Sequence, residues 1–530
     1  MPRPAAQDVP APSTPGSRSP GRSVVRSGWA RWTGLGVLVF LLGALWAAAM
    51  PLMAGPDEPS HVIWGAAVVR GQFAGELGEG AQDASRPGAG TVFELPTDYA
   101  AAAALPNCFA FRSEQDAACQ QDIAPPVPGE ESPVESFAGQ YPPLYYALTG
   151  WPSLFLAAEA ATYGMRLVTA AIVAALVTWG VWRLARTFGA SLATWASAVA
   201  VTPMCLFLAG TVNPQALEVS AAFLLWSACA ALARGPAPAT AGTWVQAAVA
   251  WALLVNSRSI SVVWAVAIAV VALVMARPGR LRAALRSRVA RWCAAGATLA
   301  TVALGAWLLG HPVLVEGELL HPDLANPLRA AHAALTETWG YLLGVVGWFG
   351  WLDAPSPELT WILWAMATGA LLLIGLAVRT QRRLTVALVL VVVGLIAAPV
   401  VMQIPNAAQT GLIWQGRYGL PVAVGLPVVA VLAFVGQDAL VRDVVRRAGR
   451  IVVPLLAVGH VMAFLEASRR FAQGTDQRLL ALTPEWSSPV GYLTGVALYA
   501  LVVGTLVLVG WRALRPGPAP VLDDGSERAP

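Results

Sequence analysis

The hydrophobic positions of this chain come in long runs of about 20 residues, separated by shorter polar segments. A run of that length, folded as an α-helix, crosses a hydrocarbon layer roughly 30 Å thick with its backbone hydrogen bonds satisfied. We therefore predict an all-α polytopic membrane protein with about twelve transmembrane helices. The expected spans are 33–53, 164–184, 190–209, 215–233, 241–256, 259–276, 292–310, 359–378, 385–404, 418–437, 451–467 and 490–510.

Clusters of arginine between these runs indicate how the helices are oriented. With twelve spans, four arginine-containing loops fall on one side of the membrane, together with both chain ends. Since cytoplasmic loops carry an excess of basic residues, this side is expected to face the cytoplasm. The four loops are those with Arg183 and Arg186, with 277–291, with 379–383 and with 442–450.

Two further segments, 141–158 and 332–351, are apolar and aromatic. Counting either one alone as a span would reverse every later loop and place arginine clusters outside. We therefore expect both to form helices in the outer interface, where Trp and Tyr are favoured.

The expected organisation is a membrane domain, 29–510, with a polar tail at each end. The tails, 1–28 and 511–530, lack periodicity and are predicted to be disordered and cytoplasmic. Two large loops, 54–163 and 311–358, are expected on the extracytoplasmic side. Loops of such length are usually functional or folded in their own right.

Composition supports lipid as the main solvent and argues against nucleic acid as a partner. Of the 530 residues, 57% are hydrophobic and 12% are charged, whereas soluble proteins carry about 25% charged residues. The net charge of +4 comes from bases clustered between apolar spans rather than along one polar face. All bases are arginine, and Ala, Gly and Pro are abundant, which indicates a GC-rich bacterial genome. The expected location is the bacterial inner membrane.

The first large loop is acidic and contains two cysteines. Residues 54–140 hold thirteen Asp and Glu against three Arg. Cys108 and Cys119 are separated by ten residues, and the other three cysteines fall within predicted spans. Because thiols oxidise outside the cytoplasm, we predict a Cys108–Cys119 disulfide, with two free thiols as the alternative.

Candidate chemistry begins with the segment PDEPSH at 56–61, directly after the first span. Pro59 suits the first turn of a helix, which Asp57 or Glu58 would cap, with His61 about one turn further on. Two carboxylates and an imidazole at the membrane surface could accept a proton from an attacking hydroxyl. They could also hold a divalent cation, with Asp57 as its ligand. The alternative is that the acids only cap an interfacial helix.

Two arginines are expected at the outer ends of spans. Arg258 lies in LLVNSRSISVVW, and Arg417 lies in IWQGRYGLP beside Tyr418. An arginine near hydrocarbon usually has a partner, and a guanidinium matches the oxygens of a lipid phosphate. All three residues are therefore candidates for substrate binding. The alternative is that the arginines extend to the headgroups of ordinary lipids.

Known nucleotide-binding and hydrolase motifs are absent from the sequence. We find no Walker loop, no HExxH and no GxSxG arrangement. An ATP-driven pump or a soluble-type hydrolase is therefore disfavoured.

Five segments occur in an order that resembles the bacterial membrane proteins called domain of unknown function 2142. They are PDEPSH, QYPPLYYAL, TVNPQALE, VGWFGWLDAPSP and WQGRYGLPV. That family is similar to the GT-C glycosyltransferases, membrane enzymes that transfer a sugar from a polyprenyl phosphate carrier on the extracytoplasmic face. The resemblance implies a GT-C-like fold.

The resemblance also implies roles for individual residues. Asp57 and Glu58 stand where GT-C enzymes have a catalytic acid, just after the first helix. A PP-L-Y segment shared with GT-C proteins includes Tyr145, which becomes a candidate for substrate binding. The chain departs from the family at Gln215, where many members have Asp, which puts a second acid in doubt.

The resulting hypothesis is a transferase that moves a sugar from a polyprenyl phosphate to a cell-envelope glycan, lipid or protein. Asp57 would act as general base or cation ligand, and Glu58 would support it. Arg417 and Arg258 would hold the carrier phosphate, because fixed cations stabilise the charge that develops there. His61 would contribute to substrate binding.

Two other classes of function remain open from the sequence. A transporter or flippase of a lipid-linked envelope intermediate would need polar residues within the spans and often an internal repeat. A non-catalytic membrane scaffold would use the outer loop to bind a partner. Few charges fall in the middle of the predicted spans and no repeat is apparent.

Overall fold

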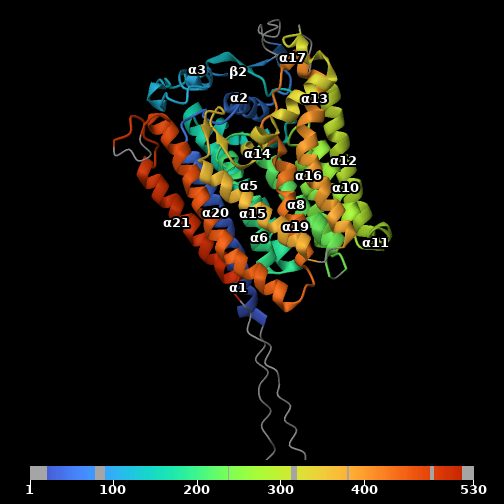
Figure 1. Cartoon of the computed structure of the whole chain (residues 1–530). Helices are drawn as coiled ribbons and strands as arrows, with labels where there is room; N and C mark the ends of the chain where they lie inside the picture. Colours follow the sequence, from blue (N-terminus) through green and yellow to red (C-terminus); the bar gives the residue numbers. More distant parts are fainter. Residues whose placement is uncertain are drawn as a thin grey trace, which may run out of the picture.

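Long helices form an elongated bundle, and short helices and strands cover one of its ends (Figure 1). The computed structural model describes residues 21–77, 90–236, 238–311, 319–378, 381–477 and 483–515. We call the covered end, which carries α2, α3 and β2, the loop end, and the opposite end, which carries α11, the arginine end. The bundle consists of α1 (Gly21–Ala49), α5 (Ala158–Phe188), α6 (Ala190–Ala200), α7 (Pro203–Ala209), α8 (Pro214–Arg234), α9 (Ala241–Val255), α10 (Ser261–Met275), α11 (Arg280–Arg286), α12 (Arg288–Gly310), α15 (Glu358–Ala377), α16 (Arg382–Gln403), α18 (Leu420–Ala423), α19 (Gly425–Ala430), α20 (Ala439–Gln473) and α21 (Tyr492–Ala513).

The predicted class, a mostly helical polytopic membrane protein, is confirmed. Within the described ranges, nine helical segments are long and apolar enough to cross a membrane, and up to eleven if two bent pairs each count as one span. The pairs are α6 with α7, bent by 76°, and α10 with α11, bent by 117°. Each of the twelve expected segments lies on one of these or on α9.

Helix α9 accounts for the difference between the eleven spans found in the described residues and the twelve that were predicted. It is apolar but only 15 residues long, which gives about 22 Å of helix against a hydrocarbon layer of roughly 30 Å. The count of twelve stays a prediction.

The predicted tails fall largely outside the described residues, which begin at 21 and end at 515. Helix α1 begins at Gly21, so the backbone is helical before the end of the expected tail at 28. The reason is that no proline occurs between Pro20 and Pro51 to interrupt the helix.

The two segments expected in the outer interface form short helices at the loop end. Segment 141–158 contains α4 (Leu144–Thr149) and a 3₁₀ turn, and segment 332–351 contains the end of α13 (Pro327–Thr336) and α14 (Thr338–Val346). None of these helices has the length of a span. A hairpin of β4 (Trp348–Phe349) and β5 (Ala354–Pro355) follows α14.

The first large loop folds into a layer over the loop end. Helix α2 (Glu58–Val69) packs beneath an antiparallel sheet of β1 (Glu76–Leu77), β2 (Thr91–Pro96) and β3 (Glu131–Ser136), in that order. Phe93 of β2 stacks on Trp64 of α2, with 5.1 Å between ring centroids. Helix α3 (Asp98–Ala104) follows, and a disulfide joins Cys108 to Cys119 across a Cα separation of 6.0 Å.

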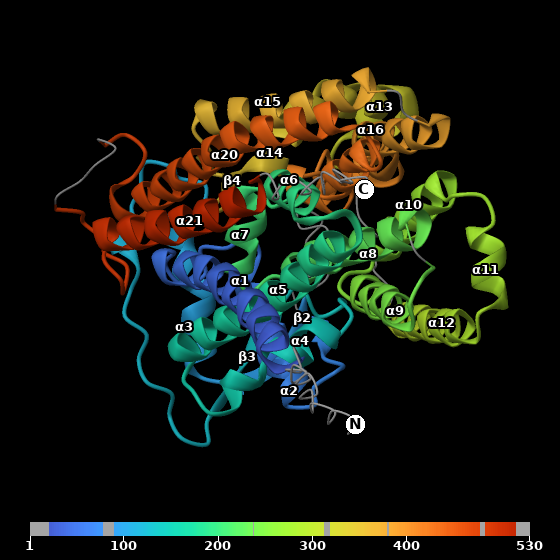
Figure 2. The same ribbon diagram turned by 90° about the horizontal axis from the view of Figure 1, so that it is seen from below.

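Helix α8 lies at the centre of the bundle, packed against α5, α9 and α10 (Figure 2). Nearly all of its side chains are buried. Small residues at the helix contacts allow such close packing. A Cβ at Gly425 of α19 would lie 2.1 Å from the Trp226 ring, whose Nε1 donates to the Pro421 carbonyl oxygen. The N-terminus of α8 reaches the loop end, directly below the segment PDEPSH.

Candidate functional site

Asp57 lies at the turn between α1 and α2 with its carboxylate open to solvent. Its backbone is in the left-handed region, with φ of 59°, which non-glycine residues adopt at a cost unless they are short and polar. The side chain makes no capping hydrogen bond to α2 and is 57% exposed. Asp57 therefore does not serve the capping role that the sequence left open, and its carboxylate remains accessible.

Glu58 is fully buried and fully bonded. Arg166 of α5 donates from Nε to Oε1 at 2.8 Å and from Nη2 to Oε2 at 2.6 Å. The backbone N–H groups of Gly55 and Val212 donate to the same two oxygens. With four donors around it, this carboxylate has no room for substrate. In the structure Glu58 is the buried counter-charge of Arg166, and the catalytic role expected of it stays a prediction.

Arg166 is a site residue that our sequence analysis did not single out. Besides Glu58, it donates to the carbonyl oxygens of Ala47, Met50 and Pro51. It thereby fixes the end of α1 against the start of α2. The available signal was an arginine inside an apolar span, which needs a partner.

Asn213 holds the same turn from the other side. Its Oδ1 accepts from the Gln215 N–H at the start of α8, so Asn213 caps that helix. Its Nδ2 also donates to the Pro56 carbonyl oxygen, at 3.0 Å. The amide of Gln215 is buried and has no hydrogen-bond partner among the described residues.

Arg417 forms the other half of the site. It lies on the 3₁₀ turn Gly416–Gly419, is 2% exposed, and donates from Nη2 to Asp57 Oδ2 at 2.9 Å. Its Nε and Nη1 are buried without a hydrogen-bond partner in the described part of the chain. Unpaired buried donors are costly, more so on a charged group. Such donors are therefore available to an anionic ligand.

A cavity of about 190 Å³ adjoins Arg417. Its walls include Glu337 and three aromatic side chains, Tyr341, Trp348 and Trp414. The cavity therefore combines flat apolar faces with a carboxylate and a guanidinium.

Arg258 lies in the same region, on the turn between α9 and α10. Its Nη1 is 3.4 Å from Glu218 Oε2, and Ser261 Oγ donates to Glu218 Oε1 at 2.6 Å. The guanidinium carbon of Arg258 lies 4.8 Å from the Tyr418 ring centroid, and that of Arg417 lies 5.3 Å from it. Tyr418 thus contacts both cations through its ring. The structure brings together Asp57, Arg417, Tyr418 and Arg258.

Tyr145 and His61 do not line the cavity beside Arg417. Tyr145 is fully buried, and its hydroxyl lies 2.8 Å from Thr169 Oγ1. His61 is 4% exposed, and its Nδ1 lies 2.9 Å from the Tyr146 hydroxyl. His61 thus joins α2 to α4, and Tyr145 joins α4 to α5. The substrate-binding roles expected of both residues stay predictions.

The pH dependence of stability should reveal the burial of His61. Burial lowers the pKa of His61 from 6.5 to about 3, opposed by Asp57 and reinforced by Arg258 and Arg417. The unfolded chain takes up this proton near its ordinary pKa and the folded chain does not until about pH 3. The free energy of unfolding is therefore expected to fall as the pH drops from about 6.5 towards 3. Thermal unfolding of the detergent-solubilised protein at about pH 7 and about pH 5 measures this decline.

The variant His61→Gln removes the titrating group. We expect its midpoint of unfolding to fall less between the two pH values than that of the wild type. An equal fall in both proteins would contradict the assignment.

The described side chains near Asp57 do not by themselves form a metal-binding site. Among the described residues, no group of three or more His, Cys, Asp or Glu side chains lies close enough to hold a metal ion. The side-chain partner of Asp57 is a cation, Arg417. A divalent cation at Asp57 therefore stays a prediction from the sequence.

All five segments that carry the sequence resemblance meet at this site. PDEPSH supplies Asp57, WQGRYGLPV supplies Arg417, and TVNPQALE supplies Asn213. QYPPLYYAL contacts α2, where Trp64 Nε1 donates to the Tyr141 carbonyl oxygen. VGWFGWLDAPSP joins through Trp351, whose Nε1 donates to the Met53 carbonyl oxygen at 3.0 Å.

Comparisons with known proteins show which family the chain belongs to. Residues 40–426 match the family described as Predicted membrane protein (DUF2142). Among solved structures, the chain is similar to ArnT from Cupriavidus metallidurans, both bound to undecaprenyl phosphate and in the apo state. Each comparison covers 92% of this chain and 77% of the other, with 15% sequence identity and a TM-score of 0.42. No curated protein matches the chain. Because the matched range covers most of the sequence and all five segments, the protein belongs to the DUF2142 family of predicted membrane proteins.

Proposed function

We propose that this protein is a glycosyltransferase of the bacterial inner membrane. It moves a sugar from a polyprenyl phosphate carrier to a cell-envelope acceptor on the extracytoplasmic face. The observation that supports this proposal is the pairing of Asp57 with Arg417. One partner is an exposed carboxylate, and the other is a buried cation with two unused donors.

The proposed reaction is a displacement at the anomeric carbon of the sugar. An acceptor hydroxyl forms the new bond to that carbon while the bond to the carrier phosphate oxygen breaks. Asp57 takes the hydroxyl proton as general base. The carrier phosphate leaves with the bonding electrons, and Arg417 and Arg258 stabilise its negative charge.

The cavity beside Arg417 suits the sugar ring. Aromatic faces pack against the apolar faces of a sugar, and the Glu337 carboxylate can accept hydrogen bonds from its hydroxyl groups. The carrier chain would remain in the surrounding lipid. Asp57, Arg417 and this cavity would thus contact the acceptor, the phosphate and the sugar respectively.

The direct test is a comparison of cell-envelope glycans. A deletion strain is expected to lose a sugar substituent that the wild-type gene restores and a gene encoding Asp57→Ala does not. An unchanged glycan profile in the deletion strain would contradict the proposal.

Cysteine labelling tests which side of the membrane each end of the bundle faces. In cells with a permeabilised outer membrane, an impermeant maleimide should label Glu130→Cys, an exposed position of the first large loop. It should label Arg442→Cys, an exposed position at the arginine end, only after the inner membrane is opened. The reverse pattern would place Asp57 in the cytoplasm and exclude an extracytoplasmic reaction.

Arg417→Lys tests the phosphate contact. Lysine keeps the positive charge but loses the planar set of donors that can bind Asp57 and a phosphate together. We expect a loss of transfer rate of about 10²-fold, as for removal of one donor to a developing charge. The rate is measured in membrane vesicles with polyprenyl phosphate sugars. Arg442→Lys, at the opposite end, should retain the wild-type rate, and an equal loss in both variants would contradict the assignment.

A further inference from the structure

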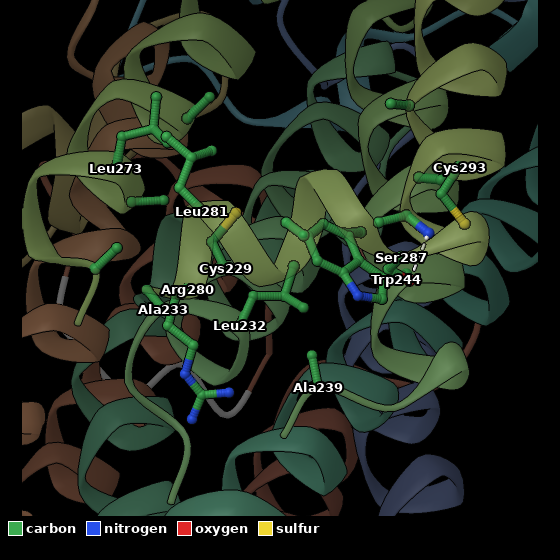
Figure 3. Close-up of a pocket in the computed structure, with 18 of the residues that line it drawn as sticks. Cys229, Leu232, Ala233, Ala239, Trp244, Leu273, Arg280, Leu281, Ser287 and Cys293 are labelled. Carbon is green, nitrogen blue, oxygen red and sulfur yellow. Dashed lines mark hydrogen bonds between the residues drawn. The ribbon is translucent and has the colours of Figure 1, made fainter. Parts of the chain in front are cut away.

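A second and larger cavity lies near the arginine end, far from Asp57. Its volume is about 490 Å³, and residues of α8, α9, α10, α11 and α12 line it. Figure 3 shows that its wall is formed by apolar side chains such as Leu232, Trp244 and Leu273, with the Arg280 guanidinium at one edge. The volume falls in the range of roughly 300–1,000 Å³ that is typical of ligand sites.

One wall of this cavity is helix α12, most of which is not buried against the rest of the protein. Helix α12 exposes large apolar side chains along its length, including Trp292 and Leu299, and little of it is buried against the rest of the bundle. Helix α11 runs across the end of the cavity after the 117° bend that follows α10. Alanines form much of the remaining wall, so an alkyl chain can lie against it without displacing large side chains.

An arginine cluster lies beside the same cavity. Arg234 ends α8 and is 5% exposed, and the charges of Arg277 and Arg383 repel it. Arg280 Nη2 donates to the Gly235 carbonyl oxygen at 2.5 Å. The residues preceding Arg234 and Arg277, Ala233 and Ala276, line the cavity itself.

The hydrogen bonds that the structure gives this cluster go to uncharged groups. Arg234 Nη1 donates to Gln381 Oε1 at 2.9 Å, and Arg383 Nη1 donates to the Ala276 carbonyl oxygen at 2.7 Å. Within the residues that the structure describes, none of Arg234, Arg277, Arg280 and Arg383 forms an ion pair with an acid. Arg234 is buried, Arg277 and Arg280 are partly buried, and Arg383 is exposed. A buried cation without a counter-charge, such as Arg234, is strongly disfavoured.

We propose that an anionic phospholipid binds at this place, with an acyl chain in the cavity and its phosphate at the arginine cluster. Guanidinium groups bind phosphate oxygens through paired, charge-assisted hydrogen bonds. Basic pockets between membrane helices bind anionic headgroups in this way. The site is separate from Asp57 and Arg417, so the inference does not depend on the proposed transferase activity.

The apolar cavity and the arginine cluster together determine which class of ligand can bind. A zwitterionic lipid would fill the cavity but bring a positive group with its phosphate, which would leave the cluster without net compensation. Inorganic phosphate would compensate the cluster but leave the apolar cavity empty. Only a ligand with both an alkyl chain and a net negative headgroup meets both requirements.

The test uses the purified, delipidated full-length protein in detergent, titrated with phosphatidylglycerol or phosphatidylcholine and followed by native mass spectrometry. Phosphatidylglycerol is expected to bind about tenfold more tightly. The double variant Arg280→Gln, Arg383→Gln should lose that preference. The matched control Arg442→Gln, Arg446→Gln removes two arginines that also donate to backbone carbonyl oxygens, and it should keep the preference.

One more protein variant and one more ligand distinguish a lipid site from a simple anion site. Ala272→Phe narrows the cavity without a change of charge and should weaken phosphatidylglycerol binding. Inorganic phosphate alone, which leaves the apolar cavity empty, should compete with the lipid only in part. Equal binding of the two lipids, equal losses in the test and control variants, or full competition by inorganic phosphate would each overturn the proposal.

A measurement on the wild-type protein does not depend on the folding of any variant. Cys293 lines the cavity and Cys205 does not, and neither is in a disulfide. Phosphatidylglycerol should slow the alkylation of Cys293 by N-ethylmaleimide at least fivefold while leaving that of Cys205 unchanged, and phosphatidylcholine should not. Equal protection of both thiols, or protection of neither, would also overturn it.

Discussion

Replacing Asp57 with asparagine is expected to lower the rate of sugar transfer by about 10²- to 10⁴-fold, the usual contribution of a positioned general base. The amide has the size of the carboxylate and can still accept a hydrogen bond from Arg417, but it cannot take a proton. The fold should survive, because this side chain is 57% exposed and does not cap α2. The rate per amount of folded protein in membrane vesicles measures the effect.

A matched control separates the loss of a base from the loss of a charge. Asp122 is an exposed aspartate in the same loop, with no ion pair among the described residues. Asp122→Asn should transfer sugar at the wild-type rate. If Asp57→Asn also kept that rate, with unfolding behaviour like the wild type, Asp57 could not be the base.

The sequence was sufficient to predict the residues of the ion pair but not the contact between them. Asp57 and Arg417 were both singled out, the first as an acid after a span and the second as an arginine at a span end. They are 360 positions apart, and local patterns carry no information on which distant helix ends meet. The ordered segments shared with the family were the one signal that joined them.

Two adjacent acids show that residue type alone does not determine whether a side chain is exposed or buried. Asp57 and Glu58 look equivalent in the segment PDEPSH, yet one is open to solvent and the other is buried. The left-handed backbone at Asp57 and the nearby Arg166 separate them, and both depend on how α1, α2 and α5 pack. An arginine within the second predicted span was the visible sign that a buried acid must exist.

The layer over the loop end was predicted only in outline. The length and acidity of the loop indicated a folded segment, and Cys108 and Cys119 were paired from their expected compartment. The strands β2 and β3 were not predicted, because each is only six residues long and contains a proline. Their pairing is stabilised by packing on α2, which a local pattern does not show.

Breaking the buried ion pair of Glu58 and Arg166 is expected to cause the largest loss of stability. Arg166→Met leaves the Glu58 carboxylate buried without its counter-charge, which should lower the free energy of unfolding by about 3–5 kcal/mol. It also removes the donors to Ala47, Met50 and Pro51 that hold the end of α1. Thermal unfolding of the purified protein, together with the yield of folded protein in membranes, measures the effect.

The double variant Glu58→Gln, Arg166→Met distinguishes charge compensation from loss of packing. Because it removes both buried charges, it should be more stable than Arg166→Met alone, and the two substitutions should show a coupling energy of the order of 1–3 kcal/mol. Additive losses would mean that Arg166 acts through its contacts with α1 alone. If Glu58 acts only by positioning Asp57, any double variant that folds should retain part of the transfer activity that Asp57→Asn lacks. A folded double variant as inactive as Asp57→Asn would instead support Glu58 as a catalytic residue.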